Sequence, residues 1–377
     1  MPIFIKRGFK FWREDVAPHL AQLATRAERL KEVIRLYEAG YAGAIYDPES
    51  RAELMEMQRR ETGYTVGSDL ATATGIADLG KGKLSIPFLA QAVKFKGCFP
   101  GAGQEQGDCV VHGLGGAAAI TIANEIWTGS PDEVSGKIEG VPDGPDVWRE
   151  GVISPNFGWW TRRRGGNGWD CASAVRGIMR EGMILMRNYP ELGIDFSDYS
   201  QGLNSRYARS GPPANVAAVA REHTIRESIE ADTQEATRDL MAAGKGIIDC
   251  GSQGYSSTRD QNGVSKRRGS WAHSMRQGGF DDRPWAYETY GEPLVLIGNS
   301  WGTWNSGGRD IQDSARYVPA ALKQFWIQMG IVNPATGNIM IPDGWFWTPW
   351  SHAANRYRIA LSGANGWVAQ DNPWLAL

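Results

Sequence analysis

A nearly uncharged stretch of nineteen residues restricts the fold of this chain more than any other feature. It runs from Cys109 to Trp127 and is interrupted by Gly113, Gly115 and Gly116. A membrane-spanning helix needs about 20 consecutive apolar residues, so this stretch predicts a buried central helix of a globular protein instead. Each glycine costs about 1 kcal/mol relative to alanine inside a helix. Their clustering therefore predicts that another backbone approaches this face closely.

The charge balance restricts the partners. The 377 residues contain 40 Lys+Arg and 42 Asp+Glu, for a net charge of −2. Such a chain has no global electrostatic attraction for nucleic acid or for an anionic membrane, so we expect neither as a partner. At about 150 residues per domain the length predicts two or three domains. The 47 glycines and 16 tryptophans are typical of a loop-rich protein with many large anchors.

The four cysteines, Cys98, Cys109, Cys171 and Cys250, lie far apart without a Cys-x-x-Cys pair. This spacing predicts neither a zinc site nor a dense disulfide framework, and we expect no metal and no cofactor. Cys171 and Cys250 are interpreted as small core residues, with a redox or disulfide role as the alternative. The N-terminal residues lack the apolar run and cleavage site of a signal peptide, so we expect synthesis in a cytoplasm.

Hydrophobic periodicity predicts a helical N-terminal region. Apolar residues recur every three or four positions from Val16 to Tyr37, which is a heptad seam. A second helix is predicted to begin after Asp47 and to end at Gly63. Together they predict an αα-hairpin, which packs either on the chain's own body or on another copy or assembly. Residues Gly75–Gly107 have no sustained period and are interpreted as a connecting segment.

The rest of the chain divides into a helical and a strand-rich half. Helices are predicted for Ala172–Tyr189 and Ile225–Gly244. Strands are predicted for three short apolar runs, which are Gly246–Cys250, Pro293–Gly298 and Gln324–Met329. The predicted domains are 1–85, a helical extension; 86–245, a helical lobe; and 246–377, a strand-rich lobe with an aromatic tail.

Three local motifs carry chemistry. Cys109 follows Gly103-Gln-Glu-Gln-Gly-Asp, His273 ends Ser270-Trp-Ala-His, and Asn299 begins Asn-Ser-Trp-Gly. A cysteine, a histidine and an asparagine in this order supply a thiol nucleophile, its base and an amide that orients the base.

At these residues the chain resembles the papain-like cysteine peptidases. The most specific part is Asn299-Ser-Trp-Gly-Thr-Trp304, and the resemblance runs from about Gln104 to Gly308. It implies an α+β, two-lobed papain-like fold. The helical lobe would carry the Cys109 helix, and the strand-rich lobe would carry His273 and Asn299. The separation of 164 positions between Cys109 and His273 slightly exceeds the family span of about 130–150.

The resemblance and the chemistry assign the same roles. Asp108 is predicted to cap the helix, so that Cys109 lies in its first turn, where the helix dipole favours a thiolate. His273 would accept the thiol proton, Asn299 would orient the imidazole, and Trp301 would shield their hydrogen bond.

Two glutamines are candidates for the oxyanion hole. With the Cys109 backbone N–H, the side-chain amide of Gln104 or Gln106 would stabilise the tetrahedral intermediate. A second register of the motif is also open. It places His112 at the nucleophile position and Cys109 at a structural cysteine, which would make the protein catalytically inactive.

The stretch Trp169–Ile184 resembles the family helix that precedes a tyrosine-proline turn, and it supports a divergent branch of the family. The segment Cys250–Asp260 resembles papain-like proteins encoded in phage structural gene clusters. This resemblance implies a virion component made in the host cytoplasm, with a cytoplasmic protein as the alternative. The expected partners are a peptide or protein substrate, and other virion proteins or a second copy bound through the N-terminal helices and the aromatic tail. The expected activity is a peptidase or amide hydrolase. An inactive structural virion protein and a transglutaminase-like enzyme are the alternatives.

Overall fold

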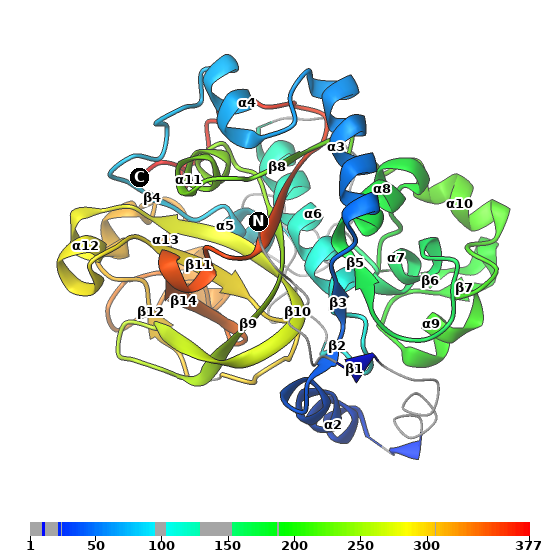
Figure 1. Cartoon of the computed structure of the whole chain (residues 1–377). Helices are drawn as coiled ribbons and strands as arrows, with labels where there is room; N and C mark the ends of the chain where they lie inside the picture. The colour runs from blue at the N-terminus through cyan, green and yellow to red at the C-terminus, as the bar shows by residue number, and fades with distance from the viewer. Residues whose placement is uncertain are drawn as a thin grey trace.

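The computed structural model describes residues 10–11, 22–23, 25–94, 103–128, 153–186, 188–305 and 307–377. Figure 1 shows the long helix α6 (Cys109–Trp127) between a twisted sheet on one side and a group of short helices on the other. Helices and strands occupy largely separate regions, so the predicted α+β class is confirmed.

Side-chain caps fix the starts of the two N-terminal helices. Thr25 forms a capping box with Glu28 at the start of α2 (Arg26–Glu38). Asp47 accepts a hydrogen bond from the Glu49 amide at the start of α3 (Pro48–Thr62). The helix α2 therefore begins later than the seam predicted, while residues 12–21, with Val16, lie outside the described part. The strands β2 (Tyr41–Ala42) and β3 (Ala44–Ile45) separate the two helices.

The segment predicted to be a plain connector contains regular structure. Its elements, after α4 (Gly67–Ala73), are β4 (Leu84–Ser85) and α5 (Phe88–Lys94). The strand β4 pairs with the sheet, and the chain end pairs with β4 in turn, since Leu84 N and Leu377 O are 3.0 Å apart. The prediction for Gly75–Gly107 is therefore wrong for these described residues, because two short elements give no readable period. Cys98 lies outside the described residues.

The helical side of the molecule follows α6 in the sequence. Its elements are α7 (Pro155–Thr161), β5 (Trp169–Asp170), α8 (Cys171–Glu181), β6 (Asn188–Tyr189), η2 (Pro190–Leu192), β7 (Ile194–Asp195), α9 (Gln201–Arg206) and α10 (Ala214–Ala220). The predicted helix Ala172–Tyr189 stops at Glu181, because Gly182 adopts a φ of 80° and a Cβ at this position would overlap the Ala220 carbonyl.

The sheet side is built mainly from the C-terminal third. Its elements are β8 (Glu227–Glu230), α11 (Gln234–Ala242), β9 (Ile247–Arg259), β10 (Ser265–Asp281), α12 (Pro284–Tyr290), β11 (Leu294–Gly298), β12 (Arg309–Asp310), η3 (Ser314–Tyr317), α13 (Lys323–Gln328), β13 (Met340–Ile341), β14 (Trp345–Pro349), α14 (Trp350–Ala353) and β15 (Tyr357–Ser362). Within the described residues the strand order is β14-β11-β10-β9-β15-β8, with β4 paired to β10.

Two predicted elements of this half have the wrong type. The predicted helix Ile225–Gly244 is strand β8 followed by helix α11, because Thr233 caps a new helix by accepting from the Ala236 amide. The predicted strand Gln324–Met329 is helix α13, which buries Trp326 as its anchor. A short apolar run does not distinguish a strand from a single-anchor helix. The strands predicted at Gly246 and Pro293 are confirmed as β9 and β11.

The predicted close approach to the α6 glycines is confirmed. A Cβ on Gly113 would lie 2.8 Å from the Met275 carbonyl oxygen of β10, and one on Gly116 would overlap the Arg276 side chain. The strand β10 therefore packs backbone against backbone on α6, which only glycine permits.

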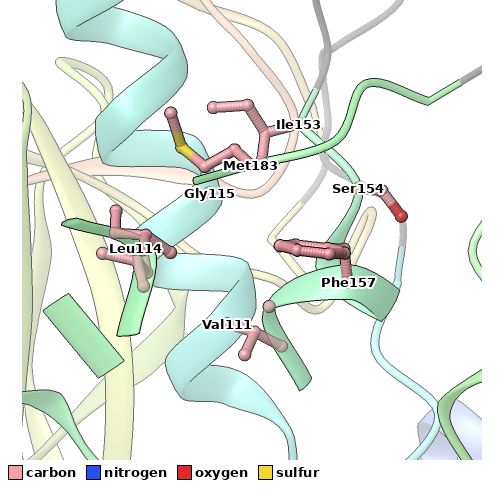
Figure 2. Close-up of a pocket in the computed structure, with 9 residues that line it drawn as sticks. Val111, Leu114, Gly115, Ile153, Ser154, Phe157 and Met183 are labelled. Atoms are coloured by element: carbon pink, nitrogen blue, oxygen red, sulfur yellow. The ribbon is translucent and has the colours of Figure 1, made fainter. Parts of the chain in front are cut away.

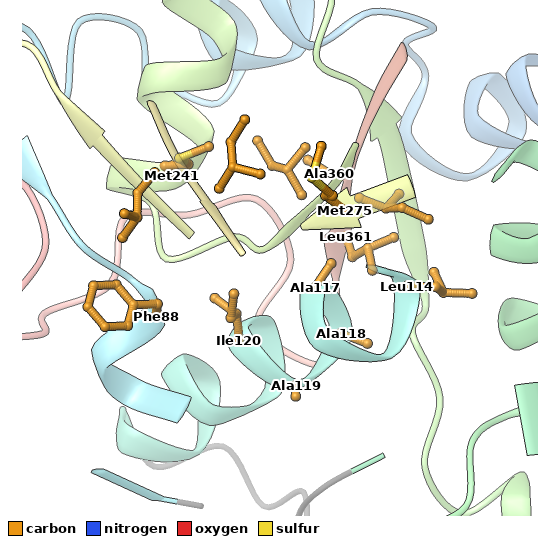
Figure 3. Close-up of a cluster of buried hydrophobic side chains, with 14 of the residues drawn as sticks. Phe88, Leu114, Ala117, Ala118, Ala119, Ile120, Met241, Met275, Ala360 and Leu361 are labelled. Atoms are coloured by element: carbon orange, nitrogen blue, oxygen red, sulfur yellow. The ribbon is translucent and has the colours of Figure 1, made fainter. Parts of the chain in front are cut away.

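The core lies between α6 and the sheet. Figure 3 shows Phe88, Ile120, Met275 and Leu361 converging there from α5, α6, β10 and β15, and all four are at most 1% exposed. By length and hydropathy α6 could cross a membrane, but 89% of its apolar window is buried inside the structure, as in the core helix of a globular protein.

The opposite face of α6 is packed less tightly. Figure 2 shows a small apolar cavity beside Gly115, lined by Val111, Leu114, Phe157 and Met183 among others. A Cβ on Gly115 would meet its nearest neighbour, an Ile153 carbon, at an ordinary 3.7 Å. Gly115 therefore differs from Gly113 although both lie on one helix.

This difference gives a prediction for two alanine substitutions. Gly113→Ala is expected to destabilise the protein by about 1–3 kcal/mol, because the β10 backbone must move. Gly115→Ala is the matched control and is expected to be neutral or to stabilise by up to about 1 kcal/mol through helix propensity. Guanidinium unfolding midpoints measure both, and equal effects would contradict the packing described.

Candidate active site

Cys109 is the first residue of α6, and the residue before it behaves differently from the prediction. Asp108 occupies the N-cap position, but its side chain makes no capping bond. Its carboxylate instead accepts hydrogen bonds from the Tyr199 hydroxyl and from Asn204 Nδ2, the latter at 2.8 Å. The predicted capping role of Asp108 is therefore wrong, since two buried donors of the helical side compete for the carboxylate. Cys109 still lies at the positive end of the α6 dipole.

The thiol of Cys109 is completely buried. The Ser274 amide donates to its Sγ at 3.3 Å, and the Tyr37 hydroxyl forms a second hydrogen bond with it. Burial raises the pKa of the Cys109 thiol to about 12, although these two hydrogen bonds lower it, and the nearby Asp108 carboxylate raises it further. In this conformation the thiol of Cys109 is therefore protonated.

His273 and Asn299 form the predicted pair. The imidazole Nε2 and Asn299 Oδ1 are 2.8 Å apart, and the same Oδ1 accepts from the Ser300 amide at 2.7 Å. An amide oxygen only accepts, so Nε2 carries the proton and Nδ1 is the basic nitrogen. Nδ1 has no hydrogen-bond partner among the described residues. The imidazole is therefore in the tautomer that can take a proton at Nδ1.

Trp301 covers this pair. Its ring lies 4.7 Å from the imidazole at an interplanar angle of 35°. His273, Asn299 and Trp301 are all fully buried. Burial lowers the pKa of His273 to about 3, although the bond to Asn299 raises it. The imidazole is therefore neutral, and the site holds a thiol and an imidazole rather than an ion pair.

Of the two candidate glutamines, Gln104 faces the site. Its Oε1 accepts from Ser300 Oγ at 2.6 Å and from Trp301 Nε1 at 3.1 Å. Its Nε2 lies 3.3 Å from the Tyr37 hydroxyl, which itself contacts the thiol. The Gln106 amide instead lies 3.5 Å from the Asp108 carboxylate. The geometry thus favours Gln104 over Gln106 as an oxyanion donor.

The contacts of His112 bear on the motif register. Its Nε2 lies 3.6 Å from Asp108 Oδ1, and its ring packs edge-on against Tyr199 at 4.8 Å. Cys109, in contrast, contacts the backbone of Ser274, the residue next to His273. Cys109 therefore lies beside the strand that carries His273, whereas His112 contacts Asp108 and Tyr199.

A segment between α2 and α3 runs through the site, and no motif in it predicts this position. The Gly43 amide donates to Ala272 O at 2.8 Å, and the Trp169 amide donates to Gly43 O at 2.9 Å. Gly43 thus bridges β10 and β5, while Tyr37 packs on His273 with ring centroids 4.8 Å apart. In the sequence Tyr37 occupies an apolar position of the heptad seam, and such a position does not predict a role for its hydroxyl.

A buried arginine supports the other side of His273. The Arg356 guanidinium pairs with Asp249 and donates from its Nη2 to the His273 carbonyl at 3.0 Å. Sequence reasoning missed it, because nothing near Arg356 marks it as different from a surface arginine. Among the described residues, no group of three or more His, Cys, Asp or Glu side chains could hold a metal ion.

Comparisons with known proteins give structural neighbours only. No protein-family model matches the chain, and no curated protein matches it in sequence. Xylellain, a cysteine protease from Xylella fastidiosa, is similar with 13% identity and a TM-score of 0.42, over 75% of this chain and 87% of that one. The Amb a 11 cysteine protease, a ragweed pollen allergen in its proform, has 13% identity and a TM-score of 0.43, over 94% and 91%.

Procathepsin L2 proteinase from the larval midgut of Tenebrio molitor is also similar, with 11% identity and a TM-score of 0.34, over 93% of this chain and 98% of that one. The structures that the chain resembles are thus papain-like cysteine proteases at low sequence identity.

The neutral state of His273 predicts a pH dependence of stability. The unfolded chain binds a proton at this residue near pH 6.5, whereas the folded chain does so only near pH 3. The stabilisation is therefore complete above pH 6.5 and is lost as the pH falls toward 3, by at most about 1.4 kcal/mol per pH unit. His273→Gln is expected to remove this slope in denaturant titrations.

His352→Gln provides the control for that titration. The pKa of His352 is also lowered by burial, but this residue is partly exposed, so its replacement should flatten the slope less. A slope that both variants leave unchanged would contradict the neutral, buried state of His273.

Proposed function

We propose that the chain is a thiol-dependent hydrolase of peptides or related amides, with Cys109 as nucleophile, His273 as base and Asn299 as orienting amide. The observation that carries this proposal is the hydrogen bond from His273 Nε2 to Asn299 Oδ1, beneath Trp301, which leaves Nδ1 as proton acceptor.

The reaction follows from these positions. Nδ1 of His273 removes the Cys109 proton, and the thiolate attacks the substrate carbonyl carbon. The oxyanion is stabilised by the Cys109 N–H and by Gln104 Nε2, which then donates to the oxyanion in place of the Tyr37 hydroxyl. The imidazolium protonates the departing amine, and water, deprotonated by His273, hydrolyses the thioester and restores the thiol.

The structure corresponds to a closed state of such an enzyme. The side chains of Cys109 and His273 are fully buried, and Tyr37 and Gly43 occupy the space above the thiol. A substrate carbonyl reaches Cys109 only when the segment 37–45 moves away. Exposure of the thiol to water then removes the main cause of its raised pKa.

The first test therefore combines exposure of the thiol with its removal. Tyr37→Ala is expected to hydrolyse a fluorogenic peptide library, whereas Tyr37→Ala/Cys109→Ala is expected to lose at least about 100-fold of that rate. Alkylation of Cys109 by iodoacetamide, followed by mass spectrometry, verifies that the thiol is exposed in the single variant. An alkylated but inactive Tyr37→Ala protein would contradict the enzyme proposal.

One observation favours the second candidate, a catalytically inactive structural protein. Gly43 forms backbone hydrogen bonds with both β10 and β5, so the closed conformation of the site is stabilised by its own contacts. For such a protein, the Tyr37→Ala variant would lose stability without gaining turnover. The turnover of Tyr37→Ala therefore separates the two candidates.

We propose further that the chain is a component of a phage particle, on the support of the sequence resemblance alone. The aromatic tail packs on its own core, where Trp374 is fully buried and donates to Asn124 Oδ1 at 2.8 Å. A docking role of the tail would require it to leave this core. The exposed side of α2 is therefore the better candidate for contact with other virion proteins or a second copy.

A direct test uses purified particles. Cells that produce this chain from a phage genome are expected to release particles that contain its peptides after a density gradient, at a constant ratio to the major capsid protein. Mass spectrometry measures this ratio across the gradient. Peptides confined to the soluble fraction would favour the cytoplasmic alternative.

A further inference from the structure

A disulfide joins the two sides of the molecule close to the candidate nucleophile. Cys171 is the first residue of α8 on the helical side, and Cys250 lies in β9 of the sheet. The two residues are bonded, with their Cα atoms 6.6 Å apart and a sequence separation of 79. Both residues lie in the core, as interpreted from the sequence, but they are not free thiols, and the alternative of a disulfide applies.

The disulfide lies close to the two backbone groups that bond to Gly43, which are the Trp169 amide and the Ala272 carbonyl. Cys171 directly follows β5, whose Trp169 amide donates to Gly43 O at 2.9 Å. Cys250 lies opposite Ser274 in the β9–β10 ladder. Ser274 is two residues from Ala272, whose carbonyl accepts a hydrogen bond from the Gly43 amide at 2.8 Å. The disulfide thus joins α8, which follows β5, to β9, which pairs with β10, and β5 and β10 are the two strands that bond to Gly43.

Ser274 links the disulfide to the nucleophile. Its amide donates to Cys109 Sγ at 3.3 Å, and its hydroxyl lies 3.2 Å from Cys250 Sγ and 3.7 Å from Cys171 Sγ. Ser274 therefore contacts both the disulfide and the thiol of Cys109. Both cysteines are only 2% exposed, so the bond is shielded from reductants in solution.

We propose that the Cys171–Cys250 disulfide is a positioning element that fixes the separation between the Trp169 amide and the Ala272 carbonyl. It holds these two backbone groups at the spacing at which one residue, here Gly43, bonds to both. In the proposed enzyme, on which this part of the inference rests, the same spacing binds the substrate backbone. The disulfide then contributes to substrate binding and leaves the chemistry at Cys109 unchanged.

The bond itself is tested first. Trypsin releases Cys171 in the peptide 165–176 and Cys250 in the peptide 246–259. Without reductant these two peptides are expected as one linked species, which separates on reduction. Two unlinked peptides, each carrying a free thiol that is alkylated after denaturation, would overturn the proposal.

The effect on spacing is tested by hydrogen exchange, which needs no activity. In Cys171→Ala/Cys250→Ala the Gly43 and Trp169 amides are expected to exchange at least about tenfold faster, whereas Leu296 in β11 exchanges as before. The two single variants should each match the double variant. Ser274→Ala, which keeps the bond but removes the hydroxyl between the sulfurs, is the matched control and should not accelerate exchange.

Two exchange results would overturn the proposal. Unchanged exchange at Gly43 would mean that packing on α6 alone sets the spacing. Equally accelerated hydrogen exchange at the Leu296 amide would mean that the bond stabilises the whole fold and not specifically the spacing between Trp169 and Ala272. If the Tyr37→Ala background hydrolyses peptides, removing the disulfide should raise KM severalfold and leave kcat within about twofold. A loss of kcat alone would also overturn it, whereas an inactive Tyr37→Ala protein affects only the proposed function.

Discussion

The contact between α6 and β10 is the constraint on which the rest of the structure depends. Gly113 lets the carbonyl of Met275 approach within a distance that any Cβ would block. This contact places the start of α6 beside Ser274, so the thiol of Cys109 contacts the residue next to His273 across 165 positions of sequence. The core residues on the sheet-facing side of α6 then have a fixed surface to pack on. The same close approach at Gly113 therefore determines both the position of Cys109 beside Ser274 and the packing of the core.

The closed site is unusual in its electrostatics. It brings together a buried neutral imidazole, a buried protonated thiol and the Nδ2 of Asn299, which has no hydrogen-bond partner within the described ranges. Each of these groups would gain solvation or a partner if the site opened, whereas the backbone bonds of Gly43 and the packing of Tyr37 oppose opening. In the proposed enzyme, the balance between these contributions decides how often the segment 37–45 moves away from the thiol of Cys109. A modest change at Tyr37 can therefore have a large effect on access to Cys109.

Short-range motifs singled out residues that the structure brings together. Cys109, His273, Asn299, Trp301 and Gln104 come from three segments and lie within a few contacts of one another, and their roles stay a prediction. The helix α6 was also predictable, since an uncharged apolar stretch of its length either spans a membrane or forms a core helix. The partners that come from distant segments, such as Tyr37 and Arg356, were missed, because tertiary placement is not encoded in their neighbours. The pairing of Cys171 with Cys250 was only an alternative for the same reason. Ile225–Gly244 failed for the same reason, because pairing with β15 overrides the helical pattern of its first half.

The position of β15 has a consequence for how the molecule is assembled. This strand lies between β9 and β8 in the sheet, although β8 ends at Glu230, β9 ends at Arg259 and β15 begins only at Tyr357. Just before it, Arg356 supports the carbonyl of His273. A nascent chain that has not yet reached residue 362 therefore lacks the complete strand that joins β8 to the rest of the sheet. Contacts of such long range are formed late. A ribosome-bound chain would then have no assembled pair of Cys109 thiol and His273 imidazole. Other molecules in the cell would encounter this pair only in the folded protein, where both side chains are buried.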